Sequence, residues 1–153
     1  MRTTHAERTK PAMLTRLDQL LADEHVLTMK TRGFHWNVTG PNFSELHKLF
    51  ETQYAELALV LDDVAERSRA LGGRALGSNA ELLRFARLKE RLGTAPSASD
   101  MLAELQADHE ALVRTLGADI AAADEESDFA TADFLTGLQS AHQKTAWMLR
   151  ASR

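Results

Sequence analysis

The stretch HWNVTGP, residues 35–41, separates two helical patterns and determines how the chain folds. Its glycine and proline both interrupt a helix, because glycine is flexible and proline lacks a backbone N–H. Beyond the break, apolar residues recur at helical spacing, and neither glycine nor proline occurs between Phe43 and Leu71. The pattern predicts one long helix over this segment, ending at Gly72-Gly73, and an earlier helix that runs to about Val38.

Four side chains that can bind a metal lie on the long helix as two pairs with i, i+4 spacing. His47 and Glu51 form the first pair, and Asp62 and Glu66 form the second. Residues four apart lie one turn apart on the same helix face. At about 100° per residue, the four positions fall within an arc of roughly 100°, so the two pairs share a face.

A single straight helix cannot bring the two pairs to one metal ion. His47 and Asp62 are about 22 Å apart at a rise of 1.5 Å per residue, whereas metal–ligand bonds are about 2.0–2.6 Å long. If the pairs act together, a second chain must supply the missing half. A two-fold axis crossing the helix near Glu56 and Leu57 would create two equivalent sites per dimer.

Composition restricts the kind of protein. A chain of 153 residues is long enough for one domain with a sizeable core. The absence of cysteine excludes disulfides and thiolate metal sites. No apolar run of about 18 residues occurs, so we expect no membrane span, and the polar N-terminus does not resemble a secretory signal, so we expect a cytoplasmic protein. The net charge of −4 argues against a nucleic-acid-binding body but leaves a basic arm possible.

The remaining helices follow from caps and apolar spacing. Residues 1–10 form a weakly basic segment that we expect to be a flexible arm, with Pro11 in the first turn of the helix that opens the folded domain, residues 11–153. Ser78 and Glu81 have capping-box spacing and predict a short helix to about Leu92. A third long helix begins near Ser97 or Ser99, and a last one follows the acidic turn at residues 124–128. The prediction is an all-α four-helix bundle with a short extra helix between helices two and three.

Three motifs, HWNVTGPNFSELH at residues 35–47, DDVAER at 62–67 and ALGG at 70–73, together resemble the Dps family. These proteins are also called mini-ferritins, or DNA-binding proteins from starved cells. The resemblance extends to residues 131–133 and 147–150 and covers nearly the whole chain after the first dozen residues. It implies a ferritin-like bundle, a closed shell of twelve chains and a metal site between two subunits, as the spacing argument requires.

The resemblance also assigns roles to the candidate ligands of a di-iron site. It implies that Asp62 and Glu66 hold the tighter iron position, with Glu66 bridging toward a second iron. It implies that His35 comes from the partner chain, with His47 and Glu51 nearer the second position. The family more often has aspartate where this chain has Glu51, and the extra methylene alters that position. Imidazole and carboxylate ligands suit Fe(II), and Zn or Mn as substitutes.

Each ligand taken alone has an ordinary alternative, as a solvated helix-face residue or a satisfied core histidine. Di-metal sites built inside one ferritin-like bundle use Glu-x-x-His on two helices. That sequence is absent here, which argues against a centre within one subunit. No convincing partner spacing exists for three other histidines, which we expect on the surface or in the core: His25, His109 and His142.

Further candidates lie beside these ligands and at the start of the last helix. Family members place the tryptophan equivalent to Trp36 beside the metal, where it can quench radicals; the alternative is a core or interface aromatic. Trp147 we expect to be a packing residue. An acidic cluster either stabilises a helix N-terminus or lines a pore at a three-fold axis that draws Fe(II) inward. Its members are Glu125, Glu126, Asp128 and Asp133.

The resemblance implies a ferroxidase that oxidises Fe(II) with hydrogen peroxide or dioxygen, stores ferric mineral in its shell and protects DNA from oxidative damage. Two adjacent Fe(II) ions can supply both electrons that the reduction of one peroxide requires. The alternative is a nucleoid-associated protein whose main role is DNA compaction. Arg2, Arg8 and Lys10 are few phosphate-binding residues for that role, although twelve copies would add avidity.

Overall fold

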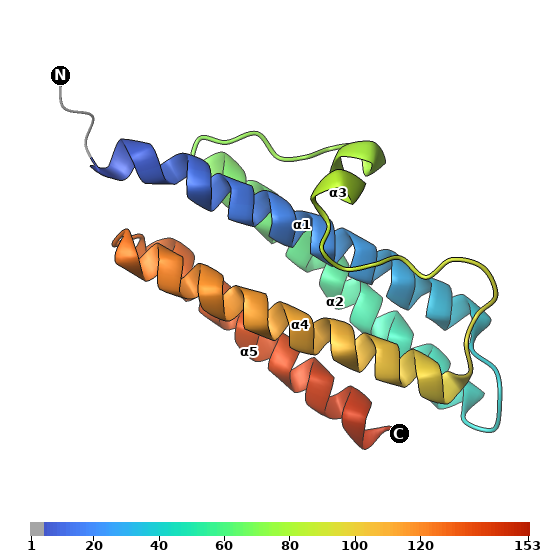
Figure 1. The fold of residues 1–153 in the computed structure, drawn as a ribbon. Coiled ribbons are helices and arrows are strands. Elements are labelled where there is room, and N and C mark those ends of the chain that lie inside the picture. Colours follow the sequence, from blue (N-terminus) through green and yellow to red (C-terminus); the bar gives the residue numbers. More distant parts are fainter. Residues whose placement is uncertain (1–4) are drawn as a thin grey trace.

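The computed structural model describes the backbone of residues 5–153 and the side chains of residues 11–153. Four long helices form a bundle, and a short helix lies between the second and third of them (Figure 1). The described residues contain no strand, so the predicted all-α fold is confirmed. The helices are α1 (His5–Asn37), α2 (Phe43–Ala70), α3 (Asn79–Phe85), α4 (Ala98–Glu125) and α5 (Phe129–Ala151).

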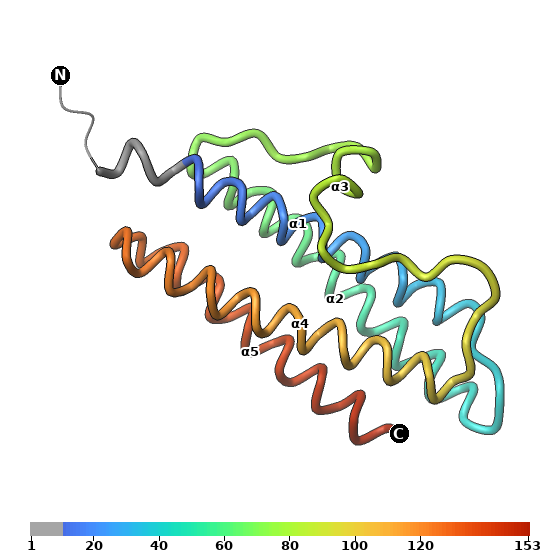
Figure 2. Tube along the Cα trace, in the orientation of Figure 1, coloured from blue at the N-terminus to red at the C-terminus, as the bar shows by residue number. Residues whose placement is uncertain are grey.

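The bundle consists of two helical hairpins. Helix α1 packs along α2, and α4 packs along α5, while α3 lies against α1 (Figures 1 and 2). The apolar faces of the four long helices meet in one core, and burying such side chains is the main stabilising contribution to folding. The largest fully buried apolar side chains are Phe50, Leu17, Leu20, Leu27, Met101, Leu105, Leu112, Leu116, Leu135 and Leu149.

Ion pairs fix the two hairpins against each other. Arg16 on α1 donates to Asp119 on α4 at 2.6 Å, and Lys30 on α1 donates to Asp108 on α4 at 2.7 Å. Burial raises the pKa of both carboxyl groups, and the neighbouring cations oppose that rise. A buried charge without its partner is costly, so these pairs specify how the hairpins align.

The breaks around α2 lie where the sequence predicts them. Gly40 has φ of +115° in the turn before α2, and its carbonyl accepts from the Phe43 backbone N–H at 3.1 Å. At the other end, Gly72 follows the helix with φ of +88°. Glycine adopts such left-handed conformations without steric penalty, so both ends of α2 are determined locally.

Helix α3 begins as predicted but ends earlier than expected. Ser78 is the N-cap and accepts from the Glu81 backbone N–H at 3.3 Å, as the capping-box spacing predicts. The Glu81 carboxylate accepts from the Ser78 hydroxyl at 3.0 Å. The helix stops at Phe85, so the prediction that it reaches Leu92 is wrong. The buried carboxylate of Asp23 on α1 accepts from the backbone N–H groups of both Arg87 and Leu88. It also accepts from the Arg87 side chain at 2.8 Å, and this network holds the chain outside the helical path.

Helix α4 is capped by Ser97, as expected. Helix α1 begins at His5, so Pro11 lies inside the helix and not in its first turn. Residues 1–4 lie outside the described part of the chain, and a role for residues 1–10 as an arm stays a prediction. None of the described helices is long and apolar enough to cross a membrane.

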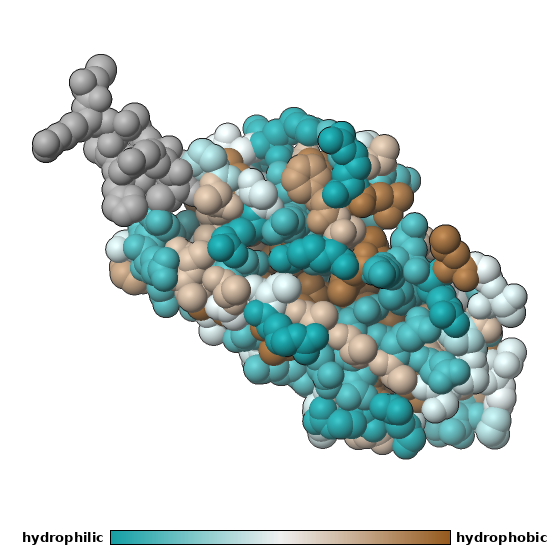
Figure 3. All heavy atoms as spheres, in the orientation of Figure 1, coloured by the Kyte–Doolittle hydropathy of each residue, from teal (hydrophilic) through white to brown (hydrophobic). Residues whose placement is uncertain are grey.

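The face of the molecule drawn in Figure 3 is largely hydrophilic. Apolar side chains gather on it around α3 (Figure 3). Leu83 on α3 and Leu92 in the following loop are among the large apolar side chains exposed in the single chain.

Candidate metal centre

Two histidines lie against each other where α1 meets α2. His35 occupies the last turn of α1, and His47 lies near the start of α2. Their rings stack with centroids 3.8 Å apart and an interplanar angle of 18°. His35 Nδ1 bonds to the His47 backbone carbonyl at 2.7 Å, and His47 Nδ1 bonds to the His35 backbone carbonyl at 2.8 Å.

This reciprocal pairing determines the tautomer of each ring. A carbonyl oxygen only accepts hydrogen bonds, so each Nδ1 must carry a proton and donate it. In the neutral rings, Nε2 then has the free lone pair that a metal ion requires. Such a second hydrogen bond is what orients histidine ligands in metal sites. The backbone carbonyls of α1 and α2 therefore orient two candidate imidazole ligands side by side.

Aromatic side chains enclose this histidine pair. Phe43 stacks on His47 with centroids 5.1 Å apart, and Tyr54 approaches His35 edge-on at 5.2 Å. The Arg32 guanidinium lies 4.7 Å from the centroid of Tyr54. The sequence analysis did not assign Phe43 or Tyr54 to the site. The signal was their spacing, four residues before and seven residues after His47, which places all three on one face of α2.

Glu51 lies one turn beyond His47 and accepts from Lys48 at 3.0 Å. That hydrogen bond and the charge of Lys48 lower the pKa of Glu51, and His35 and His47 add smaller contributions in the same direction. The carboxylate is therefore ionised at neutral pH and lies within electrostatic reach of both imidazoles. The structure thus brings together two of the predicted ligands, His35 and His47, and places Glu51 one turn further along α2.

Replacing Lys48 with methionine should raise the affinity of the Glu51 position for a divalent cation about two- to five-fold. A cation that binds Glu51 has to displace the Lys48 ammonium, and an exposed ion pair of this kind contributes little, so the expected gain is small. Calorimetric titration with Zn(II) measures the change. Lys89→Met removes an exposed lysine from the loop after α3 and is the matched control. Equal affinities for wild type and the Lys48 variant would contradict this view of the ion pair.

Asp62 and Glu66 lie further along α2, both exposed. No side chain in the described part of the chain pairs with either carboxylate. Among these residues, no three His, Asp or Glu side chains meet in a metal-binding cluster. The predicted ligands therefore form two separate groups within one chain, as the length of α2 requires.

The two tryptophans are both on the surface of the single chain. Trp36 is 60% exposed, which rules out the core alternative within the chain and leaves an interface or a place beside the metal. Trp147 is 56% exposed in the single chain, so a packing role for it stays a prediction about contacts with another chain. Its neighbour Ala146 lies on the buried face of α5, and one residue along a helix turns the side chain by about 100°.

One member of the acidic cluster has a structural role. Asp128 is the N-cap of α5, where it accepts from the Thr131 backbone N–H at 3.1 Å and from the Thr131 hydroxyl at 2.6 Å. It also pairs with Arg67 of α2 at 3.3 Å. Glu125 and Asp133 are exposed and Glu126 is half-buried. A pore lined by these four residues stays a prediction.

Comparison with known proteins identifies the family of the chain. The ferritin-like domain family matches residues 14–152. A DNA protection during starvation protein of Brevibacillus brevis is 39% identical over 88% of this chain and 90% of its own length. An uncharacterised low temperature-induced protein of Nostoc is 46% identical over 93% of this chain and 80% of its own length. The chain belongs to the Dps family. The matched residues include both groups of candidate ligands.

Solved structures of Dps proteins have the same fold. Dps from Thermosynechococcus elongatus superposes with a TM-score of 0.92 at 32% identity, covering 97% of this chain and 94% of that one. The Dps protein of Vibrio cholerae, described as a member of a broad superfamily of ferritin-like diiron-carboxylate proteins, gives a TM-score of 0.90 at 30% identity. It covers 94% of this chain and 90% of its own. The ferritin-like bundle predicted from the Dps motifs is confirmed.

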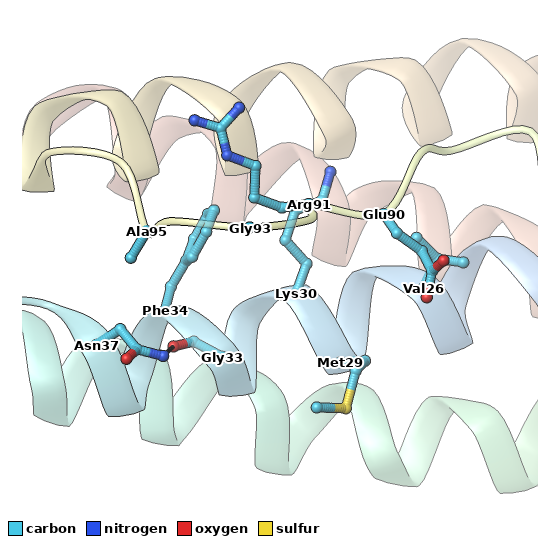
Figure 4. Close-up of a pocket in the computed structure, with 10 residues that line it drawn as sticks. All are labelled: Val26, Met29, Lys30, Gly33, Phe34, Asn37, Glu90, Arg91, Gly93 and Ala95. Carbon is cyan, nitrogen blue, oxygen red and sulfur yellow. Dashed lines mark hydrogen bonds between the residues drawn. The ribbon is translucent and has the colours of Figure 1, made fainter.

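This Dps-family chain also has a pocket of about 150 Å³ between α1 and the loop before α4 (Figure 4). Its two basic side chains are already paired, Lys30 with Asp108 and Arg91 with Glu104. None of the candidate metal ligands lines it. The pocket therefore contributes nothing to the metal chemistry considered above.

Proposed function

We propose that this Dps-family protein is a ferroxidase that oxidises Fe(II) at sites shared between two chains. The observation that carries the proposal is the stacked pair of His35 and His47, whose reciprocal hydrogen bonds leave both Nε2 atoms free to bind a metal. Glu51 adds a carboxylate to this group. Asp62 and Glu66 of a second chain complete the set, because they lie too far along α2 to reach the histidines of their own chain.

In this proposal, Asp62 and Glu66 bind the first Fe(II), and Glu66 bridges toward a second Fe(II) near His47 and Glu51. Carboxylate oxygens and neutral imidazoles suit Fe(II), and carboxylates also hold the Fe(III) produced. Zn or Mn would occupy the same positions as substitutes. Two Fe(II) ions supply two electrons and solvent supplies two protons, which together reduce one hydrogen peroxide to two waters, so no hydroxyl radical is released. In this proposal, Trp36, which follows His35 in the chain and is exposed, quenches a radical that escapes.

The proposal extends to the assembly. Twelve chains form a closed shell in which two-fold axes create the shared sites and ferric mineral collects inside. Glu125, Glu126, Asp128 and Asp133 would line an acidic entry for Fe(II). The names of the relatives support protection of DNA under stress, since the Brevibacillus protein is a DNA protection during starvation protein. Light scattering that reports only monomers or dimers at neutral pH would contradict the shell.

The ratio of iron to oxidant tests the chemistry. Hydrogen peroxide added without oxygen to protein loaded with Fe(II) should oxidise two Fe(II) per peroxide, because both electrons come from one site. Absorbance of Fe(III) against added peroxide gives the ratio, and a spin trap reports hydroxyl radical. A ratio near one with trapped radical would contradict the proposal. Repeating the experiment with dioxygen shows which oxidant reacts faster.

DNA compaction, the alternative, depends on the basic residues of the first ten positions. Arg2, Arg8 and Lys10 lie outside the side chains that the structure describes. The described residues add no observation that favours this role over iron oxidation.

A further inference from the structure

Three buried side chains form a hydrogen-bonded chain across the centre of the bundle. His142 Nε2 of α5 bonds to the Glu24 carboxylate of α1 at 2.7 Å. His142 Nδ1 bonds to His109 Nδ1 of α4 at 2.8 Å. Glu24 is completely buried, and the two histidines are 1% and 3% exposed. This relay was not predictable from the sequence, because its members are far apart in the chain and share no ligand spacing.

The relay ends at an atom without a partner. His109 Nε2 is buried and makes no hydrogen bond within the described part of the chain. The single proton between the two Nδ1 atoms can belong to either ring. When Glu24 is ionised it accepts from His142 Nε2–H, so the neutral His142 accepts at Nδ1 from His109 Nδ1–H, and His109 Nε2 is an acceptor. When Glu24 holds the proton, both hydrogen bonds reverse and His109 Nε2 is a donor, so a partner for this atom must be able both to donate and to accept. A buried polar group without a hydrogen bond is unfavourable, because it has lost its hydrogen bonds to water.

Gln53 of α2 also has buried polar atoms without a hydrogen-bond partner. It is 4% exposed, and neither its amide oxygen nor its amide nitrogen has a partner among the described residues. Gln53, His109 and His142 line one cavity of about 40 Å³. A cavity holds a water molecule when about 10–15 Å³ is available and two to four polar atoms face it. Size and lining both meet this requirement.

The cavity lies next to a wider groove between α2 and α5. The groove has a volume of about 420 Å³ and shares Gln53, Glu56 and Thr145 with the cavity. Thr52 and Lys144 add polar groups to its walls. The shared lining makes this groove the side from which we expect a water in the cavity to exchange with solvent.

We propose that the cavity is a water-binding site that completes a proton relay through Glu24, His142 and His109. One water bonds to His109 Nε2 and to the Gln53 amide, so a continuous hydrogen-bonded chain connects α1, α5, α4 and α2. Water is the occupant because it serves as donor and acceptor, whichever ring holds the shared proton. Besides the two histidines, Glu56 of α2 is the titratable side chain among the residues that line the cavity. Solvent protons thus reach a buried histidine pair that joins the two hairpins.

A crystal structure of the full assembled protein at a resolution that shows ordered water tests the site. We expect one water within about 3.2 Å of both His109 Nε2 and the Gln53 amide. In Gln53→Leu this water should be lost, whereas Gln143→Leu, on the exposed side of α5, should keep it. An empty cavity, or a direct bond between Gln53 and His109, would overturn the proposal.

Two further measurements keep the test decisive if the leucine variant fails to fold. In protein labelled with ¹⁵N-histidine, Gln53→Glu should shift the His109 Nε2 resonance, because that nitrogen shares its water with residue 53. No shift would count against the water bridge. A Co(II) soak followed by anomalous diffraction should show no peak in the cavity. A peak on His109 Nε2 would replace the water with a metal ion and overturn the assignment.

Discussion

Fe(II) oxidation should slow by at least about 100-fold when Asp62 and Glu66 are both replaced with alanine. Loss of groups that merely orient metal ligands typically costs 10–100-fold, and these two residues are the proposed ligands themselves. Stability should change little, by about 0.5 kcal/mol or less, because both side chains are exposed and unpaired within the chain. Stopped-flow absorbance of Fe(III) formation measures the rate, and urea unfolding measures the stability.

Asp63→Ala is the matched control for this pair. Asp63 is exposed and adjoins Asp62, but it lies about 100° around the helix and outside the proposed ligand set. The control variant should oxidise Fe(II) at nearly the wild-type rate. Rapid oxidation in the double variant, or an equal loss in the control, would show that the carboxylates of Asp62 and Glu66 do not bind the reacting iron.

Mild acid should destabilise the bundle through His109. Burial lowers the pKa of this histidine from 6.5 to about 3, and the neighbouring His142 contributes in the same direction. Between these two values the unfolded chain binds a proton at this position and the folded chain does not. The free energy of unfolding therefore falls as pH drops below 6.5, by up to about 1.4 kcal/mol per pH unit. Above pH 6.5 this contribution to stability is fully present.

The carboxyl groups of Asp108 and Asp119 act in the opposite direction. Burial raises both pKa values, so these groups favour the folded state as the pH falls through the carboxyl range. Urea unfolding between pH 7 and pH 5, at one protein concentration, isolates the histidine effect. We expect a loss of about 1–2 kcal/mol for the wild type and a flatter dependence for His109→Gln. The same slope in both proteins would contradict the role of His109.

The fold was largely predictable because its determinants are local. Gly40-Pro41, Gly72 and the Ser78 cap each act within a few residues, so sequence spacing locates them. The end of α3 was not predictable in this way. It depends on Asp23, which accepts backbone hydrogen bonds from a segment 64 residues later in the chain. The helical pattern of apolar residues continued past Phe85, and this tertiary contact overrode it.

The candidate site was likewise predictable only where its determinants are local in the sequence. The i, i+4 pairs and the motif around His35 identified the candidate ligands, since one helix face is visible in the sequence. The tautomers of His35 and His47 could be assigned only from the structure, because each Nδ1 hydrogen bond joins α1 to α2. The Glu24–His142–His109 relay was beyond sequence reasoning, because its partners are separated by 118 and 33 positions.

Mixed shells test the shared site most directly. The variants His35→Ala/His47→Ala and Asp62→Ala/Glu66→Ala should each be inactive, because every site of either homo-oligomer lacks two ligands. When the two are refolded together in equal amounts, about half of the two-fold dimers contain one chain of each. Such a dimer has one site without any of the four ligands and one site with all of them.

The shared-site account therefore predicts that roughly a quarter of the wild-type number of active sites returns in the mixture. Mass spectrometry establishes that both variants assemble and that their subunits mix, and single-turnover Fe(II) oxidation counts the active sites. Recovery of about a quarter supports a site built from two chains. If the subunits mix and no activity returns, the iron is bound within one chain and the account is wrong.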